Sequence, residues 1–375
     1  MFASRRDRLV YEYDATPDAA EPLVAVFPRS SSQISQVVRL AREAGIPVVA
    51  RGAGTNLSGG TVPPPGGVVL ALTRMDRVLG LELENERAMV EPGVVNLDLQ
   101  RALSPHGYLF APDPSSQKVS TLGGNVGENA AGPHCLKYGV TTNHVLGLEL
   151  VLADGRVVAT GGACEDSPGY DLTGLVNGSE GTLGVVASMI LRLIRAPEAI
   201  KTVLAVFARL EDAGNEVSDI IADGIIPATL EIMDGDTVES LAACGVDAGY
   251  PAGAGAVLLI ELDGLLQGLD RQAERIDGWC RQNGALELRI ARSEEERDQL
   301  WLGRRAAYSA LVGSSLGVGI HDLTVPRTRL AETLAGVVEI GRRQRIKIPC
   351  AAHAGDGNLH PVVLFDPRRG RRRVS

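Results

Sequence analysis

The chain has 375 residues, which is long for a single hydrophobic core and suggests about two domains. Its net charge of −9 argues against nucleic acid as the main partner, and 45% hydrophobic with 22% charged residues is ordinary for a soluble globular protein. The five cysteines are widely spaced without a C-x-x-C pair, which suits a reducing compartment and excludes a self-contained iron–sulfur or cysteine-rich zinc site.

The sequence carries no signal of secretion or of a membrane span. The N-terminus lacks the apolar region of a signal peptide, and no apolar run approaches the ~20 residues that cross a bilayer. A cytoplasmic protein without a transmembrane segment is therefore expected.

The first half of the chain predicts a mixed α and β domain. Strands are predicted at 23–27 and 46–50 around a helix that begins at Ser30–Ser32 and ends at Gly45. Further predicted elements are strands at 68–72, 78–83 and 88–90, a short helix at 97–103, a hairpin of 148–152 with 156–158, and a strand at 185–194. Arg195-Ala-Pro197 breaks the pattern, so the first domain is predicted to span residues 1–197.

A Gly-rich loop, Arg-Gly-Ala-Gly-Thr-Asn-Leu-Ser-Gly-Gly at 51–60, follows the second strand. Its glycines let the backbone adopt φ > 0 and approach a ligand closely, and its short polar side chains can donate to phosphate oxygens. A Rossmann fingerprint is excluded, because Leu57 takes the third glycine position and three prolines at 63–65 prevent a helix. The loop is interpreted as a pyrophosphate cradle, with a plain surface loop as the alternative.

Two more segments, 113–132 and 169–184, are rich in glycine and small residues. Small side chains suit a surface that lies against a flat ring system and its phosphate tail. Three separated Gly-rich loops in one domain predict an extended ligand that is held at several points.

The second half predicts strand, helix, strand, strand, helix and strand at 202–208, 210–223, 228–233, 256–262, 269–283 and 285–291, with a helical turn near 237–244. This order is ferredoxin-like. A helix at 293–312, a strand at 318–325, a helix at 328–343 and a strand at 346–351 follow, and the second domain is predicted to span 198–375.

Five segments taken together resemble the FAD-linked oxidase family of vanillyl-alcohol oxidase (PCMH) type: Pro-Arg-Ser-Ser at 28–31, the loop at 51–60, Gly-Gly-Asn-Val-Gly-Glu-Asn-Ala-Ala-Gly at 123–132, Gly-Ser-Glu-Gly-Thr-Leu-Gly at 178–184, and His-Ala-Gly-Asp-Gly-Asn-Leu-His-Pro at 353–361. The closest resemblance is to its glycolate oxidase and D-lactate and D-2-hydroxyglutarate dehydrogenase branch. It covers nearly the whole chain in order. It implies an α+β fold in which a two-subdomain PCMH-type FAD-binding domain precedes a ferredoxin-like cap domain over the flavin.

The resemblance implies FAD as the cofactor, held non-covalently because the first loop has no histidine. The loop at 51–60 would hold the pyrophosphate, 113–116 and 121–125 would line the flavin and ribityl chain, and 179–184 would lie toward the adenosine. The cofactor-binding residues so implied are Arg51, Gly52, Ala53, Gly54, Thr55, Asn56, Ser58, Gly59, Asp113, Pro114, Ser115, Thr121, Gly123, Gly124, Asn125, Gly127, Asn129, Glu180, Gly181 and Gly184.

His353 and His360 bracket a tight turn that could return both imidazoles to one side. Two histidines do not make a metal site by themselves, and two ordinary loop histidines are the alternative from the residues alone. The resemblance favours ligands to a divalent metal, zinc or manganese, that polarises the substrate. Asp356 and His321 are weaker candidates for a third ligand.

The resemblance also places an arginine that binds the substrate carboxylate at Arg304, on the predicted helix 293–312. A planar guanidinium can hold a carboxylate through two hydrogen bonds. The adjacent Arg305 ranks second, and a surface salt bridge of Arg304 with residues 294–296 is the alternative. Asp322 and Pro326-Arg327 also match the family, with a structural role expected.

The implied reaction is FAD-dependent oxidation of a small 2-hydroxy acid such as glycolate or D-lactate, by hydride transfer from C2 to the flavin. With no iron–sulfur cysteines, the electrons would leave to O2, a quinone or an Fe–S partner subunit. A peripheral place at the membrane through such a partner stays open, as do the choice of hydroxy acid and the oligomeric state.

The resemblance ends at Pro361. The family continues into a Gly-Glu-His-Gly segment with an acidic metal ligand and a candidate base, whereas residues 368–375 are Arg-rich and do not resemble it. The chain is therefore expected to be C-terminally truncated relative to the family, without the third ligand and the base. A non-catalytic flavin-binding fragment or electron-relay subunit is the alternative function.

Overall fold

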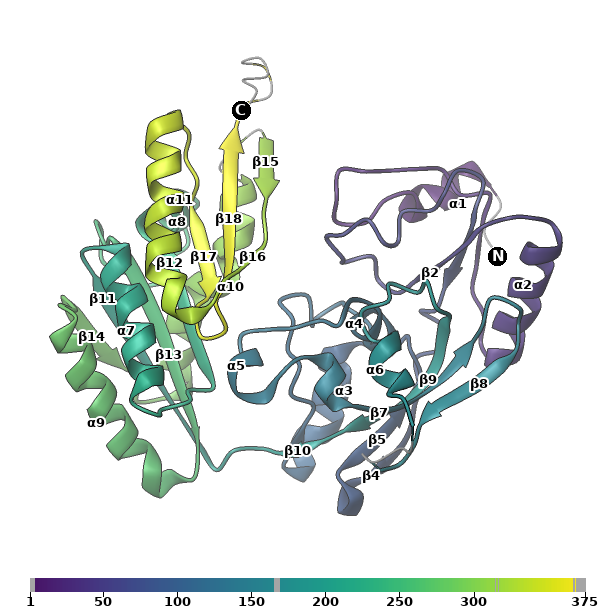
Figure 1. Cartoon of the computed structure of the whole chain (residues 1–375), viewed down its shortest axis with the longest axis horizontal. Coiled ribbons are helices and arrows are strands. Elements are labelled where there is room, and N and C mark those ends of the chain that lie inside the picture. The colour runs from purple at the N-terminus through teal and green to yellow at the C-terminus, as the bar shows by residue number, and fades with distance from the viewer. Residues whose placement is uncertain (1–3, 165–168, 314, 316, 367, 369–375) are drawn as a thin grey trace. The chain divides into compact units, whose positions relative to one another are not determined.

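The computed structural model describes residues 4–164, 169–313, 315, 317–366 and 368 (Figure 1). These residues form two compact units. The first contains the described residues up to Gly132 and the segment Tyr138–Ala196. The second contains Pro133–Lys137 and the described residues from Pro197 onward. A short helix, α5 (Cys135–Tyr138), forms where the chain returns to the first unit.

The first unit contains two larger sheets and a two-stranded one among its described residues (Figure 1). One is parallel with the order β1-β3-β2, and its strands are β1 (Val24–Val26), β3 (Val68–Ala71) and β2 (Val48–Arg51). The other is antiparallel with the order β4-β5-β9-β7-β8, and its strands are β4 (Val78–Glu82), β5 (Arg87–Val90), β9 (Val185–Arg192), β7 (Val145–Val151) and β8 (Val157–Gly161).

Helix α2 (Ser31–Glu43) connects β1 to β2 and explains where the first Gly-rich loop begins. The Ser30 side chain caps the helix by accepting a hydrogen bond from the backbone N–H of Gln33. Ile34 and Val38 are buried in one hydrophobic cluster with Leu70 of β3. The β-α-β unit predicted from the sequence therefore forms, and it delivers the Gly-rich loop at the carboxyl end of β2.

The prediction of a loop throughout 113–132 is wrong for Leu122–Glu128, which form helix α4. Its glycines disfavour a helix by about 1 kcal/mol each relative to alanine, so the local sequence does not predict one. The helix forms because the Thr121 hydroxyl caps the N–H of Gly124 and because Leu122 and Val126 are buried in the core beneath it.

Shorter elements complete the first unit. They are α1 (Arg5–Arg8), α3 (Asn96–Leu103), α6 (Leu172–Val176), β6 (Tyr108–Leu109), β10 (Ile194–Arg195), and the 3-10 turns η1 (Leu9–Tyr11), η2 (Leu83–Asn85), η3 (Ser104–His106) and η4 (Thr141–His144). Strands β6 and β10 pair with each other in an antiparallel ribbon.

The second unit is built on one antiparallel sheet with the order β14-β11-β13-β12-β17-β18-β15, and β16 also pairs with β18. Its strands are β11 (Ala199–Phe207), β12 (Thr229–Asp234), β13 (Ala256–Gly264), β14 (Glu287–Ile290), β15 (Gly317–Ile320), β16 (Leu323–Thr324), β17 (Cys350–His353) and β18 (Asn358–Phe365). The first four strands in chain order lie 4-1-3-2 across the sheet, so the predicted ferredoxin-like arrangement is confirmed.

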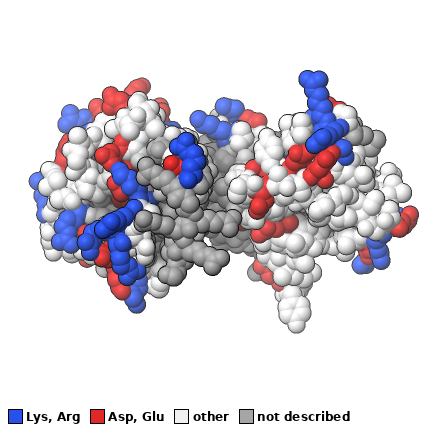
Figure 2. Space-filling model, turned by 90° about the horizontal axis from the view of Figure 1, so that it is seen from above, with Lys and Arg blue, Asp and Glu red and all other residues white. Residues whose placement is uncertain are grey.

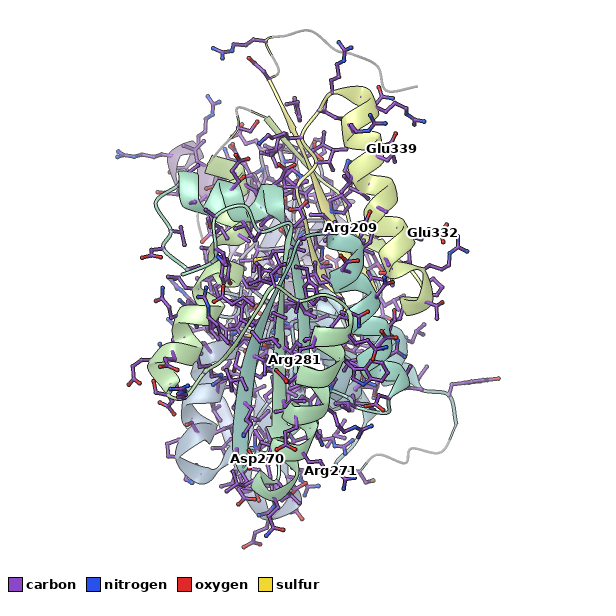
Figure 3. All side chains as sticks on the ribbon, turned by 90° about the vertical axis from the view of Figure 1, so that its left-hand side faces the viewer. Arg209, Asp270, Arg271, Arg281, Glu332 and Glu339 are labelled. Carbon is purple, nitrogen blue, oxygen red and sulfur yellow. The ribbon has the colours of Figure 1, made fainter. Side chains whose placement is uncertain are left out.

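Helices cover both faces of this sheet (Figures 1 and 3). On one face lie α7 (Leu210–Ala222), α9 (Leu266–Gln282) and α11 (Leu330–Gln344), preceded by the turn η5 (Arg327–Arg329). On the other lie α8 (Gly235–Ala243) and α10 (Glu294–Gly313). Figure 3 shows charged residues on the outer sides of α9 and α11, namely Arg271, Arg281, Glu332 and Glu339.

Three predicted boundaries in the second unit need correction. The single strand predicted at 318–325 is divided into β15 and β16 by His321 and Asp322. Strand β17 begins at Cys350, later than the predicted 346–351. The turn predicted near 237–244 is a helix of nine residues, α8, because the Asp234 carboxylate caps its first turn at the N–H of Thr237.

Basic and acidic side chains are interspersed on the molecular face in Figure 2. None of the helices in the described parts of the chain combines the length and the apolar character that crossing a bilayer requires.

Candidate functional site

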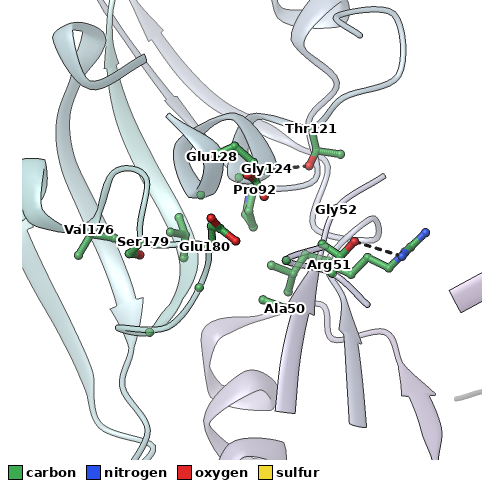
Figure 4. Close-up of a pocket in the computed structure, with 18 residues that line it drawn as sticks. Ala50, Arg51, Gly52, Pro92, Thr121, Gly124, Glu128, Val176, Ser179 and Glu180 are labelled. Carbon is green, nitrogen blue, oxygen red and sulfur yellow. Dashed lines mark hydrogen bonds between the residues drawn. The ribbon is translucent and has the colours of Figure 1, made fainter. Parts of the chain in front are cut away.

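The three Gly-rich segments meet at one cavity in the first unit (Figure 4). It contains about 590 Å³ of atom-free space, part of it open to solvent. Its walls come from the end of β2, helix α4, the segment after α6, and β9. The lining residues are Ala50, Arg51, Gly52, Gly60, Thr61, Leu72, Pro92, Thr121, Gly123, Gly124, Gly127, Glu128, Val176, Ser179, Glu180, Gly181, Gly184 and Val186.

Glycine shapes this cavity in two ways. A Cβ on Gly52 would collide with the Thr121 hydroxyl, so glycine allows the close approach of these two segments. A Cβ on Gly60 would meet the carboxylate at the end of the Glu180 side chain. At Gly127 a Cβ would meet no described atom within 4 Å, which leaves free space beside the helix. The cavity therefore has a close wall at Gly52 and an open side at Gly127.

About half of the predicted cofactor residues line the cavity: Arg51, Gly52, Thr121, Gly123, Gly124, Gly127, Glu180, Gly181 and Gly184. The remaining predicted residues do not line it: Ala53, Gly54, Thr55, Asn56, Ser58, Gly59, Asp113, Pro114, Ser115, Asn125 and Asn129. Among the residues that the sequence analysis missed, Glu128 and Ser179 lie inside the Gly-rich motifs and could have been found there. Leu72, Pro92 and Val186 come from elements that only the fold brings near.

Arg51 lines the cavity without extending its guanidinium into it (Figure 4). The guanidinium donates to the backbone carbonyl of Tyr13 at 2.7 Å and to the Thr61 hydroxyl at 3.3 Å, and it lies over the Tyr11 ring. Gly54 has φ +72°, as the Gly-rich pattern predicts, and a Cβ there would collide with the Arg51 guanidinium. The close neighbour of Gly54 is therefore Arg51.

Carboxylates lie within hydrogen-bonding distance of two polar side chains of the first loop, Ser58 and Asn56. Ser58 donates to Glu128 at 3.1 Å and also lies 3.5 Å from Glu180, while the Asn56 amide donates to Asp14 at 2.9 Å. Burial raises the pKa of Glu128, and the charges of Glu180 and Asp14 add to the rise. Carboxylates accept hydrogen bonds from hydroxyl and amide donors but repel phosphate, so these two glutamates suit the sugar or ring parts of a dinucleotide.

A second polar group lies on the α10 face of the sheet in the second unit. Glu231 of β12 is the direct register partner of His353 at the end of β17. Its carboxylate accepts a hydrogen bond from His353 Nδ1 at 2.6 Å and one from Arg304 Nε at 2.5 Å. Glu231 is fully buried, and the Arg304 side chain is 11% exposed. Within the described residues, Nη1 and Nη2 of Arg304 have no hydrogen-bond partner.

His360 of β18 completes this group. Its ring centroid is 5.0 Å from that of His353, with the two rings nearly perpendicular, so the predicted meeting of the imidazoles is confirmed. His360 Nδ1 lies 3.2 Å from an oxygen of Asp322, and this hydrogen bond lowers the pKa of Asp322. Burial lowers the pKa of His353, but the charge and hydrogen bond of Glu231 outweigh it, and the net shift is upward.

These positions settle several alternatives. The alternative of a salt bridge between Arg304 and residues 294–296 is wrong, because the partner of Arg304 is the buried Glu231. Arg305 is the surface residue of the pair: it is bonded to Asp298 at 2.8 Å, and its side chain is about half exposed.

The donor atoms around the two histidines determine whether a divalent metal could bind there. The Asn358 Oδ1 atom is buried without a hydrogen-bond partner, and the Nε2 atoms of His353 and His360 have none within the described residues. No group of three or more His, Cys, Asp or Glu side chains in the described part of the chain is placed to hold a metal ion. The described residues therefore do not complete such a site.

Comparison with known protein families matches both units. Residues 22–161 match the FAD binding domain, and residues 196–374 match the C-terminal domain of FAD linked oxidases. The chain is 45% identical over 370 residues to glycolate oxidase subunit GlcD of Bacillus subtilis, covering 97% of this chain and 78% of that protein. It is 35% identical over 361 residues to D-lactate dehydrogenase of Archaeoglobus fulgidus, covering 94% and 79%.

Solved structures show the same fold. p-Cresol methylhydroxylase with bound substrate superposes with a TM-score of 0.78 at 17% identity and covers 98% of this chain and 80% of its own. Alkyldihydroxyacetonephosphate synthase superposes with a TM-score of 0.80 at 18% identity, covering 98% and 78%.

Taken with the cavity, these likenesses define an FAD-linked oxidoreductase whose fold is similar to that of p-cresol methylhydroxylase. The first unit carries its FAD-binding domain, as the resemblance implies. The chain belongs to the FAD-linked oxidase family.

Proposed function

We propose that this enzyme oxidises a small 2-hydroxy acid at FAD and that Arg304 binds the substrate carboxylate. The observation that carries the proposal is the state of the Arg304 side chain. Its Nε is held by the buried Glu231, while its two terminal nitrogens are unpaired within the described residues. A planar pair of unused N–H donors is the form of arginine that binds a carboxylate through two hydrogen bonds. The names of the relatives, glycolate oxidase and D-lactate dehydrogenase, support a hydroxy acid.

Oxidation of the alcohol carbon removes a hydride and a hydroxyl proton, and FAD supplies the hydride acceptor when it is bound. The chain supplies orientation and a proton acceptor. With Nδ1–H donated to Glu231, a neutral His353 presents its Nε2 lone pair, and Nδ1 of His360 lies 3.2 Å from an oxygen of the more exposed Asp322. Either imidazole can take up the hydroxyl proton.

FAD is proposed to bind non-covalently at the cavity of Figure 4. The first loop offers no histidine for attachment, and the Gly-walled cavity has Glu128 and Glu180 for the hydroxyl and amide donors of the cofactor. O2, a quinone and an Fe–S partner subunit are all candidate electron acceptors.

For the metal, we propose that His353 and His360, with the free Asn358 amide oxygen, hold zinc or manganese only weakly. Three neutral donors leave the charge of a divalent ion uncompensated. No step of the proposed reaction is assigned to a metal. Elemental analysis of purified protein checks this, and a full equivalent of tightly held metal would contradict it.

The experiment compares Arg304→Lys with Arg305→Lys. Lysine at 304 keeps a positive charge for the buried Glu231 but loses the planar pair of donors, whereas Arg305 is a surface residue bonded to Asp298. Flavin reduction by glycolate, D-lactate and L-lactate is followed without oxygen. In Arg304→Lys the KM for the reactive acid is expected to rise ~30-fold or more, equivalent to about 2 kcal/mol, and in Arg305→Lys it should change about twofold at most.

Equal effects in the two variants would remove Arg304 from the site. A protein that binds FAD but is reduced by no 2-hydroxy acid would favour the non-catalytic flavin-binding or electron-relay alternative.

A further inference from the structure

We propose that Glu231 is a positioning residue that fixes the tautomer of His353 and the direction of Arg304 with one buried carboxylate. The inference rests on the proposed function for the roles of Arg304 and His353. What it adds is the origin of their geometry: a strand residue that touches neither cofactor nor substrate determines which nitrogen atoms those two side chains present.

The sheet register places Glu231 for this task. Glu231 and His353 are opposite each other on neighbouring strands β12 and β17, so their side chains leave the same face of the sheet. Helix α10 covers that face and brings Arg304 to the other carboxylate oxygen. The two oxygens thus have one donor each, at 2.6 Å and 2.5 Å, and no part of Glu231 reaches solvent.

Hydrogen-bond chemistry makes the carboxylate necessary. The Nε of arginine is always a donor, and His353 is a donor at Nδ1 as long as it bonds to a carboxylate. A side chain between two donors needs two acceptor atoms, which glutamate has and glutamine has not. Because Arg304 Nε and His353 Nδ1 each lie on a different oxygen of Glu231, both oxygens serve as acceptors.

Each bond leaves a functional atom free. With the proton of a neutral His353 fixed on Nδ1, the lone pair is on Nε2, away from Glu231. With Nε of Arg304 occupied, the guanidinium plane is set, and Nη1 and Nη2 are left to donate to a ligand. The unused acceptor of Asn358 lies in the same group, opposite His353 in the β17–β18 register. One carboxylate therefore orients an acceptor and a pair of donors.

The sheet contains a matched control. Glu261 of β13 is also fully buried, on the same face and beneath the same helix. It accepts from the Thr202 hydroxyl at 2.9 Å, from Arg297 through Nε at 2.9 Å and Nη2 at 2.8 Å, and from Trp301 Nε1 at 2.8 Å. Both Arg297 bonds go to Glu261, so its guanidinium fork is occupied, in contrast to that of Arg304.

The test compares Glu231→Gln with Glu261→Gln in the full-length, flavin-loaded protein. The readout is the tautomer of His353, from long-range ¹H–¹⁵N spectra of ¹⁵N-histidine-labelled protein in alkaline buffer, with the signal assigned by its loss in His353→Gln. Wild type is expected to carry the proton on Nδ1. In Glu231→Gln the carbonyl oxygen must take the Arg304 donor, so the amide donates to Nδ1 and the proton of His353 moves to Nε2. Glu261→Gln should keep the wild-type tautomer.

Activity gives a second readout at matched flavin content. Glu231→Gln is expected to raise the KM for the reactive hydroxy acid ~10-fold or more, because a misdirected guanidinium binds the carboxylate poorly, and Glu261→Gln should change it much less. A wild-type His353 protonated on Nε2, or an unchanged tautomer in folded Glu231→Gln, overturns the proposal. If Glu231→Gln does not fold, the wild-type tautomer alone decides.

The tautomer measurement needs no substrate. It can therefore fail while 2-hydroxy-acid oxidation is confirmed, or succeed when no hydroxy acid reduces the flavin, so failure of this inference is distinguishable from failure of the proposed function.

Discussion

The pKa values of individual buried carboxyl groups in the second unit are shifted in opposite directions by their neighbours. Burial raises the pKa of Glu261, but His134 and Arg297 outweigh it and hold the value at about 2. Glu216 on α7 is equally buried, but its hydrogen-bond partners are neutral: Cys280 at 3.3 Å and the Asn283 amide at 2.9 Å. The nearby negative charge of Asp219 also opposes its ionisation. Burial therefore dominates and raises the pKa of Glu216 to about 7.

Glu216 predicts a pH dependence of stability. Between its unfolded value near 4.5 and about 7, the folded state binds more protons than the unfolded state. The contribution of Glu216 to the free energy of unfolding should therefore be greatest below pH 4.5 and should be lost as the pH rises through 7. Between pH 5 and pH 8, the free energy of unfolding measured in urea should fall by about 1–3 kcal/mol more in wild type than in Glu216→Gln. Glu332→Gln on the exposed side of α11 should behave as wild type, and parallel curves for all three proteins would contradict the prediction.

Gly54 and Gly59 allow a test of the first loop. Both have positive φ, at +72° and +81°, so valine at either position strains the backbone. Only at Gly54 does a Cβ collide with the Arg51 guanidinium, whereas at Gly59 it meets nothing within 4 Å. Gly54→Val should displace Arg51 and lower the flavin content of purified protein at least ~10-fold, with a smaller loss in Gly59→Val. The ratio of flavin to protein absorbance measures this, and equal retention in both variants would show that Arg51 does not organise the cavity.

At the scale of elements, helix α10 is attached to the sheet by ion pairs as well as by apolar packing. Arg297, Trp301 and Arg304 recur at i, i+4 and i+7, which places them on the side that faces β12 and β13. Leu300 and Ala307 pack beside them in the core. Two buried glutamates of the sheet therefore bond to side chains of this helix.

Substitutions of the two tryptophans of the chain can test how much the bond to Glu261 stabilises the protein. Trp301 Nε1 donates to the buried Glu261 at 2.8 Å, and Trp279 Nε1 donates to the partly exposed Asp223 at 3.0 Å. Replacement by phenylalanine removes one donor in each case. Trp301→Phe should lower the free energy of unfolding by about 1–3 kcal/mol, and Trp279→Phe should cost less because water can replace its bond. The measurement is urea unfolding, and a larger loss in Trp279→Phe would contradict the role assigned to Glu261.

Sequence pattern predicts most strands and helices of this molecule, since period-two and helical spacing persist in nearly every element. It misses α4, whose glycines disfavour the helix that Thr121 and the core impose. It also misses Glu231, because a single glutamate between Leu230 and Ile232 looks like an ordinary solvent-facing strand residue. Its burial depends on α10, more than sixty residues later in the sequence. The sequence motifs identify His353 and Arg304, but only the tertiary structure shows that both side chains are hydrogen-bonded to Glu231.

At the scale of the whole molecule, five residues in the middle of the first unit belong to the second. Within Pro133–Lys137, the Pro133 carbonyl accepts the Thr229 hydroxyl at 3.1 Å, His134 Nε2 lies 3.2 Å from Glu261, and Lys137 pairs with Asp263. A fragment that starts at Pro197 would lack all three interactions, two of them on β13. The two units are therefore not separable at Pro197 alone. A chimera that takes only the C-terminal half from a relative would pair the β13 of one protein with the 133–137 segment of another. Such a chimera should therefore exchange residues 133–137 together with the chain from 197 onward.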